Sequence, residues 1–233
     1  QGTLYGRNSI GGVVNLITKN PSQDRDGYIK FGHSNYNTTK VETAFGGGIS
    51  ENTSYRLVVS STNQGEGYYD CLNAGCGEQG YTDKSAYRLK VNTELNDNIS
   101  ADVMVASVST DGTPNPYGWI TDNRALSTSF GIPQLAAEPI SLKPHKIYQT
   151  PTSESVNGTN STDREYDVSA LTLSIETDFG TIKSVTANQE FNDQFNLDRD
   201  GTAAALLDTV DISETETFTQ EINLNIERDT MSL

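Results

Sequence analysis

The residues with the clearest capacity for covalent chemistry are two cysteines in the stretch YYDCLNAGCGEQGY. Cys71 and Cys76 are the 2 cysteines of the chain. In an oxidising compartment such a pair forms a disulfide that closes a small loop. A structural metal site would need further ligands close by, and the neighbouring sequence supplies none. The pair therefore predicts a Cys71–Cys76 disulfide and no metal site.

The sequence offers no recognisable catalytic constellation. The 2 histidines, His33 and His145, have no plausible nucleophile near them in the chain, and His145 falls in a long segment that reads as a loop. Carboxylates are so numerous that no particular pair stands out as a general acid and base. We therefore expect a protein that is not an enzyme and that uses no cofactor.

The composition is acidic and polar. The chain has 31 acidic and 16 basic residues, a net charge of −15 that would repel the phosphates of nucleic acids. Hydrophobic residues make up 34% of the chain, and the polar remainder is rich in Thr, Ser, Asn and Gly, as in all-β proteins with many turns. No apolar run reaches the roughly 18 residues of a membrane helix, a test that does not apply to membrane-spanning strands.

The dominant pattern along the chain is alternation with a period of two, which predicts β-strands. In residues 85–95, Tyr87, Leu89 and Val91 face one way, while Arg88 and Lys90 face the other. The same split into an apolar face and a polar face recurs in seven further segments of the sequence: 28–35, 40–50, 52–63, 98–110, 164–179, 181–191 and 217–228.

The connections between these segments alternate between short and long. Tight turn chemistry occurs at 50–52, 96–98 and 178–180, whereas long excursions occupy 64–84, 111–163 and 191–216. The connection near 35–37 is the exception, because it is short although its place in the alternation calls for a long loop. Long strands with short turns at one end and long loops at the other are typical of an outer-membrane β-barrel. The alternatives are a soluble β-sandwich and a self-contained eight-stranded barrel of structural or adhesive role.

The first residues, QGTLYGRNSIGGVVNLITKNP, resemble the end of the plug domain of TonB-dependent outer-membrane receptors. The stretches NQGEGYYD at 63–70 and FTQEINL at 218–224 resemble, more loosely, barrel-strand motifs of that family. The residues that carry the plug-motif resemblance, besides Gln1 and Thr18, are Gly2, Leu4, Tyr5, Gly6, Arg7, Asn8, Gly11, Gly12 and Asn15.

The resemblance implies two unequal parts. Residues 1–23 would be the C-terminal end of a plug domain, in which Val13, Val14, Leu16 and Ile17 form a buried strand. Residues 24–233 would be the N-terminal part of an antiparallel transmembrane β-barrel. About eight strands are expected here, whereas plugged transporters have about 22, so the chain is expected to be a fragment of an all-β transporter.

The resemblance also implies a function. Members of the family import a scarce nutrient, most often a ferric siderophore and sometimes cobalamin, a sugar or another chelate. The implied partners are the lipid and lipopolysaccharide of the Gram-negative outer membrane, a small-molecule ligand such as a ferric chelate, and the TonB complex. We expect the contact with TonB to lie in an N-terminal region that this sequence does not include.

Site residues follow from the same resemblance. Aromatic and acidic residues in the outer loops are candidate ligand contacts, and the alternative for Tyr68 and Tyr69 is an aromatic girdle at the membrane interface. Glu221, on the lumen side by its parity, is a candidate contact between plug and barrel, either with a plug arginine such as Arg7 or with water. Arg56, Arg88 and Lys90 share that side and need partners if buried. The ligand candidates are Tyr68, Tyr69, Asp70, Tyr117 and Trp119.

Overall fold

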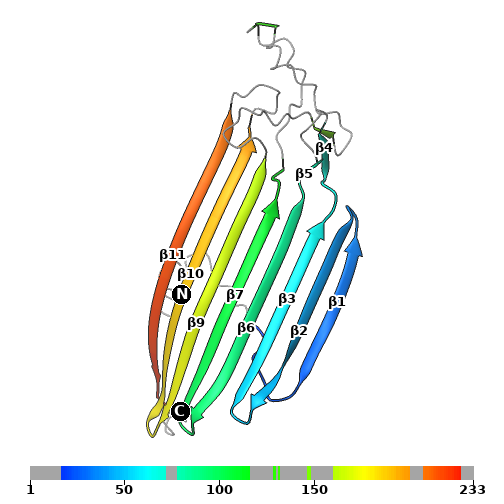
Figure 1. Ribbon diagram of the computed structural model, residues 1–233. Helices are drawn as coiled ribbons and strands as arrows, with labels where there is room; N and C mark the ends of the chain where they lie inside the picture. Colours follow the sequence, from blue (N-terminus) through cyan, green and yellow to red (C-terminus); the bar gives the residue numbers. More distant parts are fainter. Residues whose placement is uncertain are drawn as a thin grey trace, which may run out of the picture.

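The computed structural model describes residues 17–71, 78–115, 128–129, 131, 146–147, 160–199 and 207–226. Their main feature is one curved antiparallel sheet with the strand order β1-β2-β3-β6-β7-β9-β10-β11 (Figure 1). The strands are β1 (Asp26–Ser34), β2 (Thr38–Ser50), β3 (Thr53–Gln64), β6 (Thr82–Asn96), β7 (Ile99–Gly112), β9 (Ser161–Thr177), β10 (Gly180–Asp198) and β11 (Asp208–Asn225).

A second, small sheet lies at the loop end of the main sheet, the upper end in Figure 1. Its strands are β4 (Tyr69–Cys71), β5 (Glu78–Gln79) and β8 (Lys146–Ile147), in the order β5-β4-β8. Strand β4 pairs antiparallel with β5 and parallel with β8. The long connections after β3 and β7 therefore contribute to one structure above the main sheet.

The main sheet has no second layer within the described residues. Only Ala44, Ala101 and Leu197 are buried among its apolar side chains there, whereas Ile29 is 79% and Ile222 is 71% exposed. In a sandwich these side chains would pack against an opposing sheet, so a soluble β-sandwich is excluded for this part of the chain. No helix in the described segments is long and apolar enough to span a membrane.

The two outermost strands of the sheet, β1 and β11, do not pair with each other in the part of the chain that the structure describes. Figure 1 shows them at opposite edges of an open sheet. The eight strands therefore do not close into a small barrel of their own. They have the curvature and strand lengths of a section of a larger barrel wall, with strands of 9 to 19 residues.

The structure corrects three sequence-based boundaries. The excursion predicted at 191–216 is mostly strand, because β10 continues to Asp198 and β11 begins at Asp208. Phe179 lies in the β9–β10 turn and not in a strand. Ile17, predicted in a buried strand, has no regular structure and is 86% exposed, because no described element covers it on the side away from the sheet.

The tight turn between β9 and β10 depends on Gly180. Its φ of 142° is unfavourable for other residues, and a Cβ there would lie 2.1 Å from the carbonyl oxygen of Asn225 in β11. We expect Gly180→Ala to lower the free energy of unfolding of the intact protein by about 1–3 kcal/mol, measured by urea titration in detergent. Gly32→Ala is the matched control, since its Cβ would meet only Lys40 Cβ at 3.8 Å. Equal stability of both variants would contradict this role.

Candidate functional site

The strand register divides the side chains of the sheet between two faces. Residues paired across neighbouring strands share a face, and alternate residues of one strand take opposite faces. The row Asn92, Asp102, Thr172, Val185 and Glu221 belongs to one face, which we call the polar face. The opposite face, which we call the apolar face, has a band of half-buried to exposed aliphatic and aromatic side chains, including Leu57, Leu89, Val103, Leu171 and Phe218.

Positive charge follows the same division. Every Lys and Arg of the eight main-sheet strands lies on the polar face, as the register of each strand pair requires: Lys30, Lys40, Arg56, Lys84, Arg88, Lys90, Arg164 and Lys183. The parity predicted for Arg56, Arg88, Lys90 and Glu221 is therefore the parity that the sheet adopts. Such a division suits a wall with lipid on one side and a polar lumen on the other.

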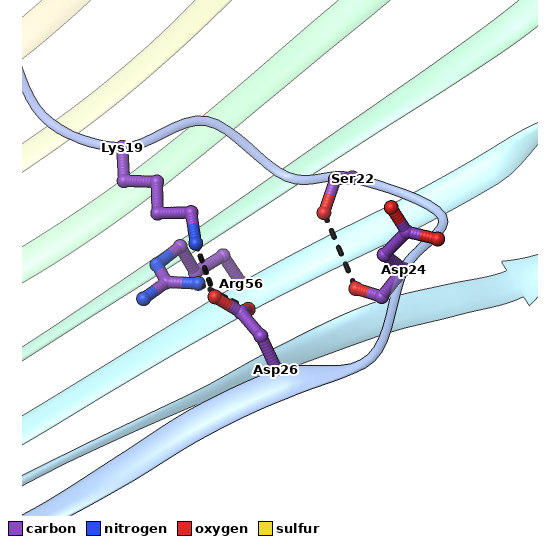
Figure 2. Close-up of polar contacts among 5 residues, drawn as sticks. All are labelled: Lys19, Ser22, Asp24, Asp26 and Arg56. Carbon is purple, nitrogen blue, oxygen red and sulfur yellow. Dashed lines mark hydrogen bonds and ion pairs between the residues drawn. The ribbon is translucent and has the colours of Figure 1, made fainter.

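The chain leading into β1 crosses the polar face and is held there by a cluster we call the wall anchor: Lys19, Asp26 and Arg56 (Figure 2). The Asp26 carboxylate accepts hydrogen bonds from the Lys19 ammonium and, at 2.7 Å, from Arg56 Nη1. The Arg56 side chain is only 9% exposed, whereas Lys19 is 60% exposed. Arg56, the inner residue of the anchor, is thus a nearly buried cation that is paired with the Asp26 carboxylate.

The anchor is possible because a glycine stands between its two strands. Asp26 pairs with Gly46, and Gly46 pairs with Arg56, so the three residues form one row on the polar face. Since Gly46 has no side chain, the Asp26 carboxylate and the Arg56 guanidinium meet across β2. The sequence analysis missed Asp26, because its partner lies 30 residues away. Only the hairpin register would have brought the two together.

A second set of contacts holds the crossing segment further along. Lys90 Nζ donates to Asn20 Oδ1 at 3.0 Å and lies 3.5 Å from the carbonyl oxygen of Thr18. The Gly48 amide donates to the Gln23 carbonyl oxygen at 3.1 Å. A cavity of about 260 Å³ lies beside this crossing, lined by Asn20, Lys90, Asp102 and Lys183 among others. The segment from Thr18 to Asp26 is therefore attached to β2, β3 and β6.

Some cations of the polar face have ion-pair partners and others do not. Lys30 pairs with Glu42 at 3.1 Å, and Arg164 pairs with Asp193 at 3.0 Å. In the described part of the chain, Lys90 and Lys183 form no ion pair. None neutralises Lys40, Lys84 and Arg88 there either, and these three are called the unpaired cations below. Lys40 in β2 and Lys84 in β6 both pair with Thr62 in the strand between them. Their backbones are therefore two strand spacings, or about 10 Å, apart. These three charges lie nearer the loop end than the wall anchor.

The aromatic candidates are placed only in part. Tyr68 is 42% exposed at the loop end, where its ring meets that of Tyr36 edge-on with centroids 4.6 Å apart. Tyr69 belongs to β4, and its ring lies close to Gly80. Asp70 pairs with Glu78 in the small sheet. Tyr117 and Trp119 lie outside the described residues, so their ligand role stays a prediction.

The other predicted site residues have different outcomes. All of the plug-motif residues from Gly2 to Asn15 lie outside the described residues, as does Cys76, so the plug motif and the disulfide remain predictions. Glu221 is exposed on the polar face and accepts a hydrogen bond from Asn223 Nδ2 at 2.8 Å. Among the described residues, no three His, Cys, Asp or Glu side chains are grouped as metal ligands.

Comparison with known proteins gives both sequence and structural relatives. The chain is 30% identical over 138 residues to the pesticin receptors of Yersinia enterocolitica and Yersinia pestis, a match that covers 57% of this chain and 20% of each relative. It superposes over its whole length on 32% of the crystal structure of the ferric yersiniabactin uptake receptor FyuA from Yersinia pestis, with a TM-score of 0.73 and 19% identity. No family model matches the chain.

Sequence and fold point to the same group of proteins. The structural match shows the barrel fold, and the pesticin receptors add a sequence match to receptors of the same kind. The chain spans about a fifth of the length of these curated relatives. The chain supplies eight antiparallel strands of that fold, and the two matches support the predicted resemblance to a fragment of a TonB-dependent outer-membrane receptor.

Proposed function

We propose that this chain forms part of the lumen wall of a receptor that imports an anionic ferric chelate, most simply a ferric siderophore. The carrying observation is the set of unpaired cations on the polar face: Lys40, Lys84 and Arg88. In a confined lumen such charges raise the local concentration of anions. The solved structure to which the chain is similar is, by its name, a ferric yersiniabactin uptake receptor.

The proposed process moves a ligand and breaks no covalent bond, so the receptor is not an enzyme and needs no cofactor. The relatives are receptors. Energy would come from the TonB complex, which would act on a plug domain whose C-terminal end we place at residues 1–23, with the barrel from residue 24. The outward apolar band would contact lipid and lipopolysaccharide, and the acidic chain would bind no nucleic acid.

The wall anchor gives this proposal a mechanical element. If TonB pulls on the plug, the load reaches the barrel through the segment that crosses the polar face. The contacts of Lys90 with this segment would take the load first, and the Asp26–Arg56 pair would take it next. Because Asp26 is the first residue of β1, an anchored Asp26 would protect this strand from being pulled off the sheet.

The test compares an anionic and a neutral chelate on the full-length receptor. Replacing both Lys84 and Arg88 by Gln removes two lumen charges and is expected to weaken binding of ferric citrate by about tenfold, near 1.4 kcal/mol. Binding of a neutral ferric trihydroxamate should not change. Affinities are measured by titration with iron-55 complexes.

Lys30→Gln serves as the matched control, because Lys30 already pairs with Glu42. It should leave both affinities unchanged. An equal loss of affinity for the neutral chelate, or an unchanged affinity for the anionic chelate, would contradict the proposed role of the lumen cations. If neither chelate binds the wild-type receptor, iron-chelate import itself is the wrong function.

A further inference from the structure

The loop end of the sheet contains a cavity of about 490 Å³ that the proposed import function does not use. It lies where β3 and β7 end, β5 leads into β6, and β9 begins. The polar residues important here are Gln64, Glu78, Tyr81, Asp111, Thr113 and Asn160. A volume of this size is typical of small-molecule sites and is far larger than the roughly 30 Å³ share of one water molecule.

Hydrogen bonds within the lining and to its immediate neighbours fix the walls of this cavity. Gln64 Nε2 donates to the carbonyl oxygen of Glu66 at 2.9 Å, and the Gly67 amide donates to Glu78 Oε2 at 2.8 Å. On the opposite side, the Gly80 amide donates to Thr113 Oγ1 at 2.7 Å. The lining is therefore largely formed before any ligand arrives, which lowers the entropic cost of binding.

Asn160 is the one cavity residue with a buried, unpartnered donor. The residue is 7% exposed, and its Oδ1 accepts a hydrogen bond from the Asp198 amide at 2.7 Å. Within the described part of the chain its Nδ2 has no hydrogen-bond partner. Leaving a buried N–H group without an acceptor is costly, so a group that supplies an acceptor there would be stabilised.

The cavity also contains acceptors and a second donor. The Asp111 side chain forms no hydrogen bond or ion pair with any other described residue. One carboxylate oxygen of Glu78 accepts a hydrogen bond from the Gly67 amide, and the other can accept one from a ligand. Burial raises the pKa of Tyr81, and the nearby Asp111 and Asp83 carboxylates add to this effect, so the hydroxyl stays protonated at neutral pH and can donate.

These groups select the ligand by elimination. An anion would satisfy Asn160 Nδ2 but would meet the carboxylates of Asp111 and Glu78. An ammonium group would pair with the carboxylates but offers no acceptor to Asn160. A hydroxyl group both accepts from Asn160 and donates to Asp111. We propose that this cavity binds an uncharged, hydroxyl-rich group, such as a sugar ring or another polyol.

The test uses the purified full-length receptor in a detergent without a sugar headgroup. Saturation-transfer NMR titrations are recorded with methyl glucoside, methyl galactoside and sorbitol, and with inorganic phosphate as the anionic probe. We expect at least one polyol to bind and phosphate not to bind. Asn160→Asp keeps the Oδ1 acceptor but loses the N–H donors, and Asp111→Asn loses the anionic acceptor. Each is expected to weaken polyol binding at least tenfold.

Asn225→Asp, at the end of β11 on the polar face and outside the cavity lining, should bind like the wild type. Circular dichroism and heat-dependent gel mobility identify variants that do not fold, and Asp111→Asn carries the test if Asn160→Asp is one of them. The proposal is overturned if no polyol binds, if phosphate binds as well as the polyols, or if a folded Asp111→Asn variant binds polyol with unchanged affinity.

Discussion

Replacing Leu171 by Arg is expected to destabilise the receptor in the membrane by about 2–4 kcal/mol, the cost of a cation on the lipid face near the bilayer midplane. Leu171 is 39% exposed on the apolar face and pairs with Val103, which is exposed on the same face. The expected observation is a sharp loss of folded receptor in outer-membrane fractions. The remaining protein should unfold at a lower urea concentration in lipid vesicles.

The matched control changes the next residue. Thr172 lies on the polar face and pairs with Asp102, so an Arg at this position gains a carboxylate neighbour and avoids lipid. Thr172→Arg is therefore expected to assemble normally. Equal damage from both substitutions would mean that the two sides of the wall do not differ, and it would contradict the membrane orientation of the sheet.

The second large effect concerns the wall anchor. Asp26→Asn leaves the nearly buried Arg56 guanidinium without its carboxylate. Breaking a fully buried ion pair costs roughly 3–5 kcal/mol. Because the Asp26 side chain is 36% exposed, we expect a loss of stability below that range but above the loss for a fully exposed pair. Urea unfolding of the intact receptor measures this loss, and hydrogen exchange should show faster opening of β1 and of residues 18–25.

Lys19→Ala provides the comparison within the same cluster. Lys19 also pairs with Asp26, but it is 60% exposed, and exposed ion pairs contribute about 0–1 kcal/mol. Its loss should leave β1 protected from exchange. If Lys19→Ala proves as damaging as Asp26→Asn, the buried Arg56 is not the centre of the anchor.

Alternation made most of the wall predictable. In 85–95 the separation of Leu89 and Val91 from Arg88 and Lys90 gave the strand and the correct parity, because one side of the strand meets apolar surroundings. The turns at 50–52, 96–98 and 178–180 were identified by their Asn, Asp and Gly residues, and β2, β3, β7 and β9 follow the expected order. Antiparallel pairing of neighbours then fixed the topology.

The loop end was less predictable, and the reason is physical. Near the loop end polar and charged residues occur on both faces of a strand, so the alternation is weaker although backbone pairing continues. Glu214, for instance, pairs with Asn192 in a region of the sequence that reads as a loop. The extensions of β10 and β11 are therefore stabilised by register with their neighbours and leave only a weak trace in local hydropathy, such as the alternation of Val210 and Ile212 with polar residues.

The candidate site divides in the same way. Single residues were assigned to the polar face from parity, as for Arg56 and Glu221. Their partners could not be assigned, because the Asp26–Arg56 pair depends on two hairpin registers and on a glycine between them. Asn160 gave no signal in the sequence, since its importance comes from burial beside a cavity.

The central claim is that this sheet is a barrel wall with lipid on one side and a polar lumen on the other. A spin-label scan of β9 tests this claim directly. Single labels are placed at each position from Val168 to Ile175 of the full-length receptor, in which Cys71 and Cys76 are changed to Ser. The labelled proteins are measured in outer-membrane vesicles. Oxygen partitions into lipid and should relax the labels at 169, 171, 173 and 175. A water-soluble nickel chelate should relax the labels at 168, 170, 172 and 174. Accessibility without a period of two, or with the opposite phase, would contradict the claim.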